Sequence, residues 1–351
     1  MRVLRYLTIL LMGCLIYSKA SPQQLPFTTH YTVNPYSLNP AFAGTENRSQ
    51  LFLNYRHDWA SIPGSPRTYR MNGYGQLANN LFIGGELMSD LADIFYRFKA
   101  GVSVSYRLQL ASNQYLSFGL AGHLFQSVIR LDQSVIQDSD DPVLRDLDRM
   151  LRSNFNTSFG LVYQADEFTI GFGMPVMIRT KEAYWSENSH RFAYERAYNL
   201  YLSNRFEIDA SWDFTPIILV QKTINQPTTV DLSAMFRYER QFWAGFHYRN
   251  SMVFGLNAGF KLINGILFHY SYEFGGGELL AQSGGTHEIS IGWSRQLEKT
   301  NTRKRPSRRI DYGSYRYNDP NRNHNNRSES PIAPLAPPKR KPHFAPYEKF
   351  N

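Results

Sequence analysis

Residues 252–262 read MVFGLNAGFKL, and every second side chain, starting from Met252, is apolar. The runs ILFHYSYEFG at 266–275 and EISIGWS at 288–294 alternate in the same way. Successive side chains of a strand point to opposite faces, so each run has one aromatic, apolar face and one face of Gly, Ser and other polar residues. Runs of about ten residues with this pattern are typical of outer-membrane barrel strands, which turn the apolar face to lipid and the polar face to the lumen.

The composition points in the same direction. Aromatic residues make up 15% of the 351 residues, charged residues only 19%, and the mean hydropathy is −0.43. Tyr is favoured at membrane interfaces, and the chain has 23 of them. After the N-terminus no apolar run reaches the ~18 residues that a spanning helix needs. Any integral membrane structure must therefore be a closed barrel, because lipid offers no partner to an open strand edge.

Residues 1–20 are predicted to be a secretory signal peptide. Arg2 and Arg5 precede an apolar core, and Ala20 ends a small-residue cleavage site. Cys14, the only cysteine, lies in that core, and lipidation at a lipoprotein-type box ending there is the alternative. If the chain is cut after Ala20, neither a disulfide nor a thiolate metal site can form.

Residues 21–48 are predicted to form a periplasmic or plug-like N-terminal segment. Four prolines make regular structure unlikely, because Pro removes a backbone donor and forces the preceding residue to be extended. The pairs Asn34-Pro35 and Asn39-Pro40 are expected to start turns.

A transmembrane β-barrel of about fourteen antiparallel strands is predicted within residues 49–297. The expected strands are 50–57, 67–76, 80–88, 97–109, 114–130, 154–164, 167–174, 192–204, 208–222, 228–239, 241–250, 252–262, 265–274 and 286–297. Pro216 makes the ninth irregular. Alternate connections are short and long, the asymmetry of periplasmic turns and outer loops, which predicts that both termini are periplasmic.

The loop at 131–153 is the longest connection. Asp141-Pro142 could start a short amphipathic helix there. The loop is also acidic, but its spacing lacks the calcium-loop pattern, so a solvated loop is the better interpretation.

Residues 298–351 are predicted to be a disordered periplasmic tail rich in Pro, Asn and basic residues. They hold 13 Lys and Arg against 5 Asp and Glu, so most of the chain's net charge of +9 lies there. An acidic protein surface or an envelope polymer is a possible partner of this tail. The alternative is that the tail is a solvated spacer without a partner. Nucleic acid is not expected as the partner of an exported chain.

No catalytic, cofactor or metal constellation stands out. His287-Glu288 lacks the second His of a zinc helix and lies on a predicted strand. His269, Ser271 and Glu273 share one strand face and resemble the arrangement of outer-membrane lipid A deacylases, which leaves a barrel lipid hydrolase as one alternative. Polar residues on the lumen face of a barrel strand are the ordinary explanation.

Several ordered motifs resemble the PorP/SprF family of type IX secretion system membrane proteins. They are LNPAFAG at 38–44, LNYRHDW at 53–59, PGSPRT at 63–68, SYEF at 271–274 and GGTHEISIG at 284–292. Asp58 departs from the family pattern, which usually has Gln before the Trp, and the basic tail is longer than the family needs.

The resemblance implies an outer-membrane component of the type IX secretion and gliding machinery that handles or anchors exported surface cargo such as adhesins. It also implies association with the periplasmic ring lipoprotein complex, membrane lipid as surroundings, no cofactor and no enzyme activity. The motif residues that could dock partners are Asn39, Pro40, Ala41, Ala43, Gly44, Tyr55, Arg56, Trp59, Pro66, His287 and Glu288.

Two questions stay open at this level. The motif residues could merely fix the N-terminal segment and the first hairpin, with Arg56 against an aromatic ring or a lumen carboxylate, or they could form a docking surface. The other alternative function is a channel for hydrophobic solutes of the fatty-acid-transporter kind, which also combines fourteen strands with an N-terminal plug.

Overall fold

The computed structural model of the chain describes residues 26–129, 151–183, 191–276 and 283–297. The chain divides into two compact units, 1–300 and 301–351, and the second lies outside the described residues. The predicted signal peptide with Cys14, the loop helix with its acidic residues, and the basic tail also lie outside them.

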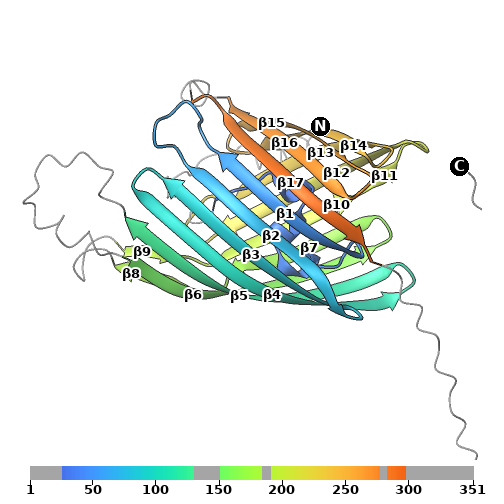
Figure 1. Cartoon of the computed structure of the whole chain (residues 1–351), viewed down its shortest axis with the longest axis horizontal. Coiled ribbons are helices and arrows are strands. Elements are labelled where there is room, and N and C mark those ends of the chain that lie inside the picture. The colour runs from blue at the N-terminus through green and yellow to red at the C-terminus, as the bar shows by residue number, and fades with distance from the viewer. Residues whose placement is uncertain (1–25, 130–150, 184–190, 277–282, 298–351) are drawn as a thin grey trace, which may run out of the picture. The chain divides into compact units, whose positions relative to one another are not determined.

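Within the described residues, fourteen antiparallel strands close into a barrel, as the sequence predicts, and Figure 1 shows how they are arranged. Each strand pairs with the next one along the chain, β1 pairs with β17, and the β10–β12 pairing completes the ring. The strands are β1 (Arg48–His57), β2 (Arg67–Ala78), β3 (Leu81–Ala92), β4 (Phe95–Ala111), β5 (Gln114–Ile129), β6 (Leu151–Ala165), β7 (Phe168–Val176), β10 (Ala197–Asn204), β12 (Trp212–Thr223), β13 (Thr229–Tyr238), β14 (Phe242–Arg249), β15 (Val253–Lys261), β16 (Ile266–Gly275) and β17 (Thr286–Gln296).

Two parts of the predicted strand pattern differ in the structure. The expected strand 192–204 is shorter, because β9 (Arg191–Tyr194) pairs with β8 (Thr180–Ala183) in a separate hairpin. The connection from β10 to β12 is longer than expected and carries the two-residue strand β11 (Phe206–Glu207), which pairs with β12.

The connections define two ends of the barrel. At the turn end, tight turns place Asn80, Asn113 and Asp166 at positive φ, a conformation that Asn and Asp tolerate. The first residue of β1 and the last of β17 also lie at this end, paired with each other. The loop end carries the longer connections, including residues 58–66 between β1 and β2.

Pro216 is accommodated where it removes no ladder bond to β10. The β10–β12 register ends at the pair of Ser203 and Ile217, and Ile217 is the residue that follows Pro216 in the sequence. Central strand positions exclude Pro because it cannot donate, so the ladder stops where the donor is missing.

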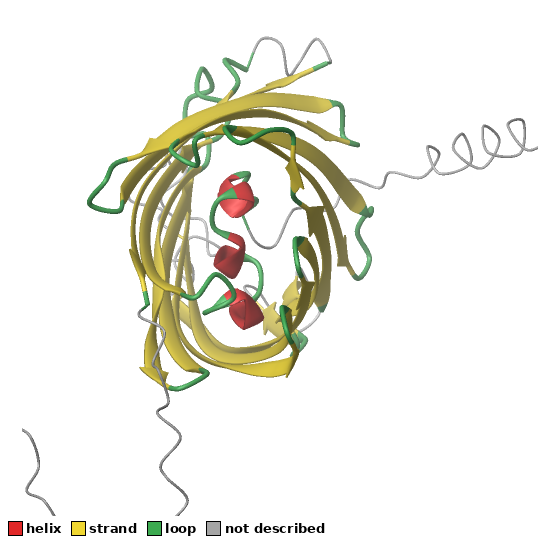
Figure 2. Cartoon of the chain, turned by 90° about the vertical axis from the view of Figure 1, so that its right-hand side faces the viewer, coloured by secondary structure: helices red, strands yellow, loops and turns green. Residues whose placement is uncertain are grey.

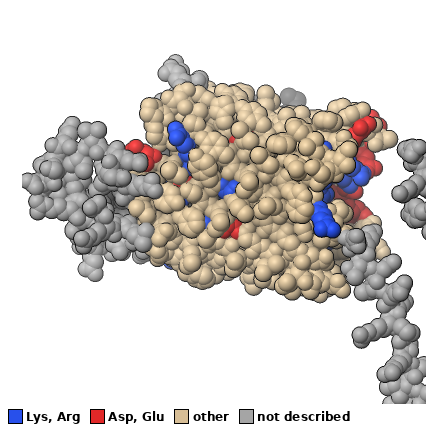
Figure 3. Space-filling view, viewed as in Figure 1, with Lys and Arg blue, Asp and Glu red and all other residues tan. Residues whose placement is uncertain are grey.

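The alternation of side chains separates a lipid-type exterior from a polar lumen. On β16, Phe268 and Tyr270 are exposed on the outside, whereas His269 and Ser271 are buried inside. In the view of Figure 3, charged side chains gather toward the ends of the barrel and most of its middle is uncharged. Among the described residues, no helix has both the length and the hydropathy of a membrane-spanning helix.

The N-terminal residues occupy the lumen as three short 3-10 turns (Figure 2). These are η1 (His30–Thr32), η2 (Pro35–Ser37) and η3 (Pro40–Phe42). The last two begin at the Asn-Pro pairs, so the predicted turn starters do start turns, and Asn39 caps η3 by accepting from the backbone N–H of Ala41. The main apolar cluster therefore lies inside the barrel, between this segment and the wall.

Candidate functional site

Residues 27–44, which we call the lumen segment, meet the wall of the barrel at two contrasting surfaces. One is a set of buried charges on β1, β13, β14, β16 and β17. The other is a glycine-rich surface on β5, β6 and β7. Together they position the family-like motif at 38–44 and the residues just before it.

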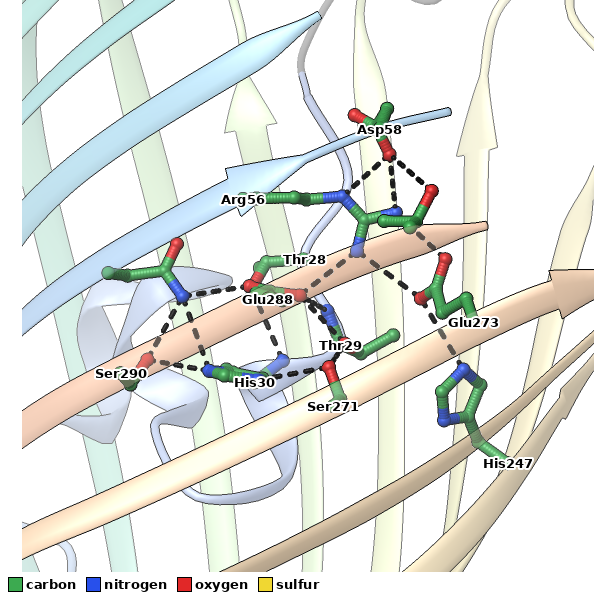
Figure 4. A network of polar contacts seen from close by, with 12 residues as sticks. Thr28, Thr29, His30, Arg56, Asp58, His247, Ser271, Glu273, Glu288 and Ser290 are labelled. Carbon is green, nitrogen blue, oxygen red and sulfur yellow. Dashed lines mark hydrogen bonds and ion pairs between the residues drawn. The ribbon is translucent and has the colours of Figure 1, made fainter. Parts of the chain in front are cut away.

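We call the buried charges the ion cluster. Its members are Arg56, Asp58, Asp231, Arg249, Glu273 and Glu288. Arg56 Nη2 lies 2.8 Å from Glu273 Oε2, and Nη1 lies 2.9 Å from Glu288 Oε2 (Figure 4). Arg249 Nη2 lies 3.2 Å from Glu273 Oε1, so Glu273 bridges the two arginines. Asp58 and Asp231 complete the cluster at 2.8 and 3.2 Å from Arg56 and Arg249.

The lumen segment supplies donors that the ion cluster needs. Glu288 is fully buried and accepts from the backbone N–H of Thr29 at 2.9 Å and from its hydroxyl at 2.7 Å. The Thr28 hydroxyl donates to the other carboxylate oxygen. A buried carboxylate is costly unless it is paired and hydrogen-bonded. Glu288 is therefore satisfied by Arg56 and Asn54 of the barrel wall on one side and by the lumen segment on the other.

A chain of hydrogen bonds fixes the tautomer of His30. The Thr29 hydroxyl donates to Glu288, so it accepts from the Ser271 hydroxyl, 3.0 Å away. Ser271 has then used its hydrogen and accepts from His30 Nε2 at 3.1 Å, which places a proton on Nε2. Ser290 Oγ and Asn54 Nδ2 lie 2.6 and 3.2 Å from the other ring nitrogen, Nδ1. An Nδ1 that accepts from Asn54, whose amide nitrogen can only donate, leaves the ring neutral.

The environment of His30 agrees with a neutral ring. Burial lowers the pKa of His30 below its usual 6.5, although the nearby carboxylate of Glu288 acts to raise it. The ring also packs 4.3 Å from that of His269, centroid to centroid. Protonation would therefore work against the bound position of the lumen segment.

Tyr31 and Phe27 attach the start of the lumen segment to Asp231 and Arg249, the members of the ion cluster on β13 and β14. The Tyr31 hydroxyl donates to Asp231 at 2.6 Å and bonds to Ser233 at 2.9 Å. Burial, followed by the charge of Asp231, raises the pKa of Tyr31 well above its usual value. The guanidinium carbon of Arg249 lies 3.5 Å from the centroid of the Phe27 ring, a close cation–π contact.

The second surface is a strip of wall that lacks side chains. A Cβ on Gly160 would lie 1.7 Å from Asn39 Oδ1, and one on Gly119 would lie 2.3 Å from the backbone N of Ala41. A Cβ on Gly171 would lie 3.0 Å from the Phe42 ring. The LNPAFAG motif thus fits because neighbouring strands present glycine where it touches them.

Polar bonds continue along the segment beyond this strip. Asn39 Nδ2 donates to the Phe172 carbonyl at 2.9 Å. Near the turn end, Ser105 Oγ donates to the Ala43 carbonyl at 3.3 Å and Arg107 Nη1 to that of Gly44 at 3.2 Å. Backbone carbonyls of the motif are therefore satisfied by wall side chains.

The loop at 58–66 is tied tightly to its neighbours at the loop end. The N–H of Ala60 donates to Gly285 O at 2.9 Å, and that of Ser61 to Ser283 O at 3.0 Å. Trp59 is held at a φ of +51°, an unusual backbone conformation for a large residue. Its side chain is 42% exposed, as is that of Ile62. The loop thus presents two apolar side chains on a fixed backbone outside the strands.

The structure separates the candidate motif residues into three groups. Arg56 and Glu288 meet in the ion cluster, and Asn39, Pro40, Ala41, Ala43 and Gly44 lie inside the lumen. Tyr55 and His287 point outward, where they contact Tyr69 and Tyr270. Trp59 and Pro66 lie in the loop at 58–66, whose ends are joined by a bond from Asp58 N–H to Pro66 O.

The strand neighbours considered for hydrolysis do not form a nucleophile–base pair. Ser271 bonds to Thr29 and His30 of the lumen segment. His269 Nδ1 instead accepts from the Trp243 indole at 2.8 Å, and Glu273 is engaged by the arginines. Within the described ranges, no group of three or more His, Cys, Asp or Glu side chains is arranged to hold a metal.

Sequence reasoning missed several members of the site. His30, Asp231 and Arg249 were not singled out, although inward charges on predicted strands 228–239 and 241–250 were a usable signal. Gly119 and Gly160 also passed unnoticed, because glycine on a lumen face is common. The role of Asp58 becomes clear from the structure: its carboxylate adds a charged partner to Arg56.

Comparison with a family model gives one match. The model described as type IX secretion system membrane protein PorP/SprF covers residues 20–293. A search of curated proteins finds no match.

Solved structures with a similar chain path include outer-membrane proteins and transporters. A Pseudomonas aeruginosa FadL homologue has 12% identity and a TM-score of 0.45, over 74% of this chain and 93% of that one. The P. putida toluene transporter TodX has 10% identity and a TM-score of 0.43, over 74% and 93%. Outer membrane protein Omp33 of Acinetobacter baumannii has 8% identity and a TM-score of 0.40, over 72% and 100%. Likeness at this level says nothing about what this chain binds or transports.

Proposed function

The chain belongs to the PorP/SprF family of type IX secretion system membrane proteins, and from this premise we propose that it is an outer-membrane component that holds exported cargo at the cell surface. The family is described as type IX secretion system membrane proteins. The barrel is the part that resides in the outer membrane.

The occupied lumen is the observation that carries this proposal. Three turns of the lumen segment lie in the interior, and the bonds of this segment reach β17, β2 and β7. A barrel filled in this way is better suited to serve as an anchor than as an open passage for a folded protein. Cargo is therefore held at the loop end, which we assign to the outside because long loops of such barrels face the exterior.

The loop at 58–66 is the proposed contact surface for cargo. Trp59 and Ile62 are apolar, exposed and held on a backbone that is already ordered, so binding costs little conformational entropy. Trp is enriched among residues that dominate binding energy. Arg56 and Asp58 connect this loop to the ion cluster, so the lumen segment and the contact surface support each other.

The proposal is tested by replacing Trp59 with Ala in a strain that lacks the native gene. We expect the barrel to insert normally while exported proteins at the cell surface fall by tenfold or more and appear in the medium. Trp212→Ala is the matched control, because Trp212 is 43% exposed but lies at the turn end. Normal surface display in the Trp59 variant, or an equal loss in both variants, would refute the assignment of this loop.

A further inference from the structure

The contacts of the lumen segment follow one direction along the barrel. Its first part lies at the loop end: Phe27 packs on Arg249, the last residue of β14 before a loop-end connection. Thr28 and Thr29 bond to Glu288. Glu288 is the third residue of β17, a strand that begins at the loop end.

The middle of the segment meets the middle of the strands. Asn34 Nδ2 donates to Asn72 Oδ1 at 2.8 Å, halfway along β2. The Tyr36 hydroxyl lies 2.7 Å from Ser103 Oγ, halfway along β4. Within the seven to nine residues that separate Phe27 from Asn34 and Tyr36, the segment therefore passes from the loop end to the middle of the barrel.

The last part reaches the turn end. Gly44 accepts from Arg107, four residues before the end of β4, and Asn47 O accepts from the N–H of Leu297 at 3.0 Å. β1 begins immediately afterwards at Arg48. The chain thus crosses the lumen once, from the loop end to the turn end, before the first strand starts.

We infer that the two ends of the barrel unit open on opposite sides of the outer membrane. Phe27, near the start of the described residues, lies at the loop end, and Leu297, the last described residue, lies at the turn end. This differs from the sequence-based expectation that both termini are periplasmic. With long loops outside, the mature amino terminus is displayed at the cell surface and only the basic tail faces the periplasm.

The packing supports a single crossing. For the amino terminus to return to the turn end, a second stretch of chain would have to pass the lumen segment. That segment already touches walls on both sides, at Gly160 and at Glu288. The ion cluster also holds Thr29 and Tyr31 by four hydrogen bonds to carboxylates or their neighbours, which fixes the direction of the segment at the loop end.

An epitope inserted between Gln24 and Leu25, with a flexible Gly-Ser linker, tests the inference in the full-length chain. Intact cells should bind the antibody as well as permeabilised cells do. An epitope added after Asn351 should be reached only after permeabilisation. Immunoblotting checks that the signal is removed from both variants.

Two further variants calibrate the two sides. The same epitope at Ile62 marks the loop end, and the epitope at Ile263 marks the turn between β15 and β16. An amino-terminal epitope that behaves like the one at Ile263, hidden until the membrane is permeabilised, would overturn the inference. Because no export is measured, this outcome is independent of whether the chain handles cargo.

Discussion

Glu288 Oε2 lies 2.9 Å from Arg56 Nη1, and the same carboxylate accepts the backbone N–H of Thr29. One side chain thus joins the first strand, the last strand and the lumen segment. Arg56 and Glu288 also face each other in the register of β1 and β17, the pair of strands that brings the two ends of the barrel sequence together. The closure of the barrel and the position of the lumen segment therefore depend on the same buried contact.

Replacing Glu288 with Gln should weaken both the closure of the barrel and the attachment of the lumen segment. Arg56 keeps Glu273 and Asp58, but the cluster loses a buried charge partner, which typically costs about 3 kcal/mol. Unfolding in lipid vesicles, followed by tryptophan fluorescence, should show this decrease in the free energy of unfolding. Glu167→Gln is the control, because its exposed pair with Arg205 should contribute at most about 1 kcal/mol. Equal stability of the two variants would contradict the role assigned to Glu288.

Gly160→Ala should displace the motif at 38–44. The new Cβ would lie 1.7 Å from Asn39 Oδ1, which neither the strand nor the capped turn can absorb. We expect single-channel conductance in planar bilayers to rise severalfold above that of the unchanged protein, and Asn39→Ala to lower it again in the double variant. Gly122→Ala is the control, since its Cβ would meet the Phe155 ring at an ordinary 3.5 Å.

The Gly160 variant also addresses the alternative of a hydrophobic-solute channel, through solute uptake into liposomes. Such a channel should take up solute into liposomes without any change to the lumen segment. A filled barrel should not. Uptake by the unchanged protein that equals uptake by the Gly160 variant would favour the channel over the anchor.

Acid should weaken the docking of the lumen segment through His30. Its pKa is lowered by burial, so the docked state prefers the neutral ring. The stabilisation is complete above the usual pKa of 6.5 and is lost as pH falls below it, by up to about 1.4 kcal/mol per pH unit until the lowered pKa is reached. Hydrogen exchange of residues 27–44 should therefore quicken between pH 7 and pH 5, beyond the intrinsic effect of pH.

His30→Asn is the matched variant for this measurement. It should show exchange that varies less over the same range, because Asn does not titrate. The other ionisable groups around His30 are Glu288, Arg56, Glu273, His247 and His269. A pH dependence that persists unchanged in the Asn variant would move the effect from His30 to those groups.

The basic tail is proposed to contact the periplasmic ring lipoprotein complex of the secretion system. Its 13 basic residues suit an acidic partner surface. Deleting residues 298–351 should leave the barrel inserted but reduce co-purification with the ring proteins severalfold, most clearly at low salt. Co-purification that is unchanged by the deletion would leave the tail as a spacer.

The sequence allowed the barrel to be predicted well because each strand carries its own signal. Period-two alternation is local, so β15 and β16 were located within a residue or two at each end. In the structure, tight turns with a residue at positive φ, such as Asn113, separate neighbouring strands. Where a strand is interrupted, as before β10, the local pattern could not distinguish one strand from a strand and a hairpin.

The contacts of the lumen could not be predicted in the same way. Arg56 was expected to find a lumen carboxylate, but its partners Glu273 and Glu288 lie more than two hundred residues away along the chain. Alternation places a side chain inside the barrel without fixing its height or neighbour. The fit of Gly160 to Asn39 depends on three-dimensional register, which a single sequence does not reveal.

The central claim is that the LNPAFAG motif lies inside the barrel against β7. A cysteine pair at Asn39 and Gly173 tests it most directly, because the Asn39 Cβ lies 3.3 Å from the position of a Gly173 Cβ, close to the spacing of a disulfide. In outer-membrane fractions we predict a cross-link between these two positions and none between Asn39→Cys and Gly245→Cys on β14. Absence of the first cross-link under mild oxidation, or equal formation of both, would contradict the account.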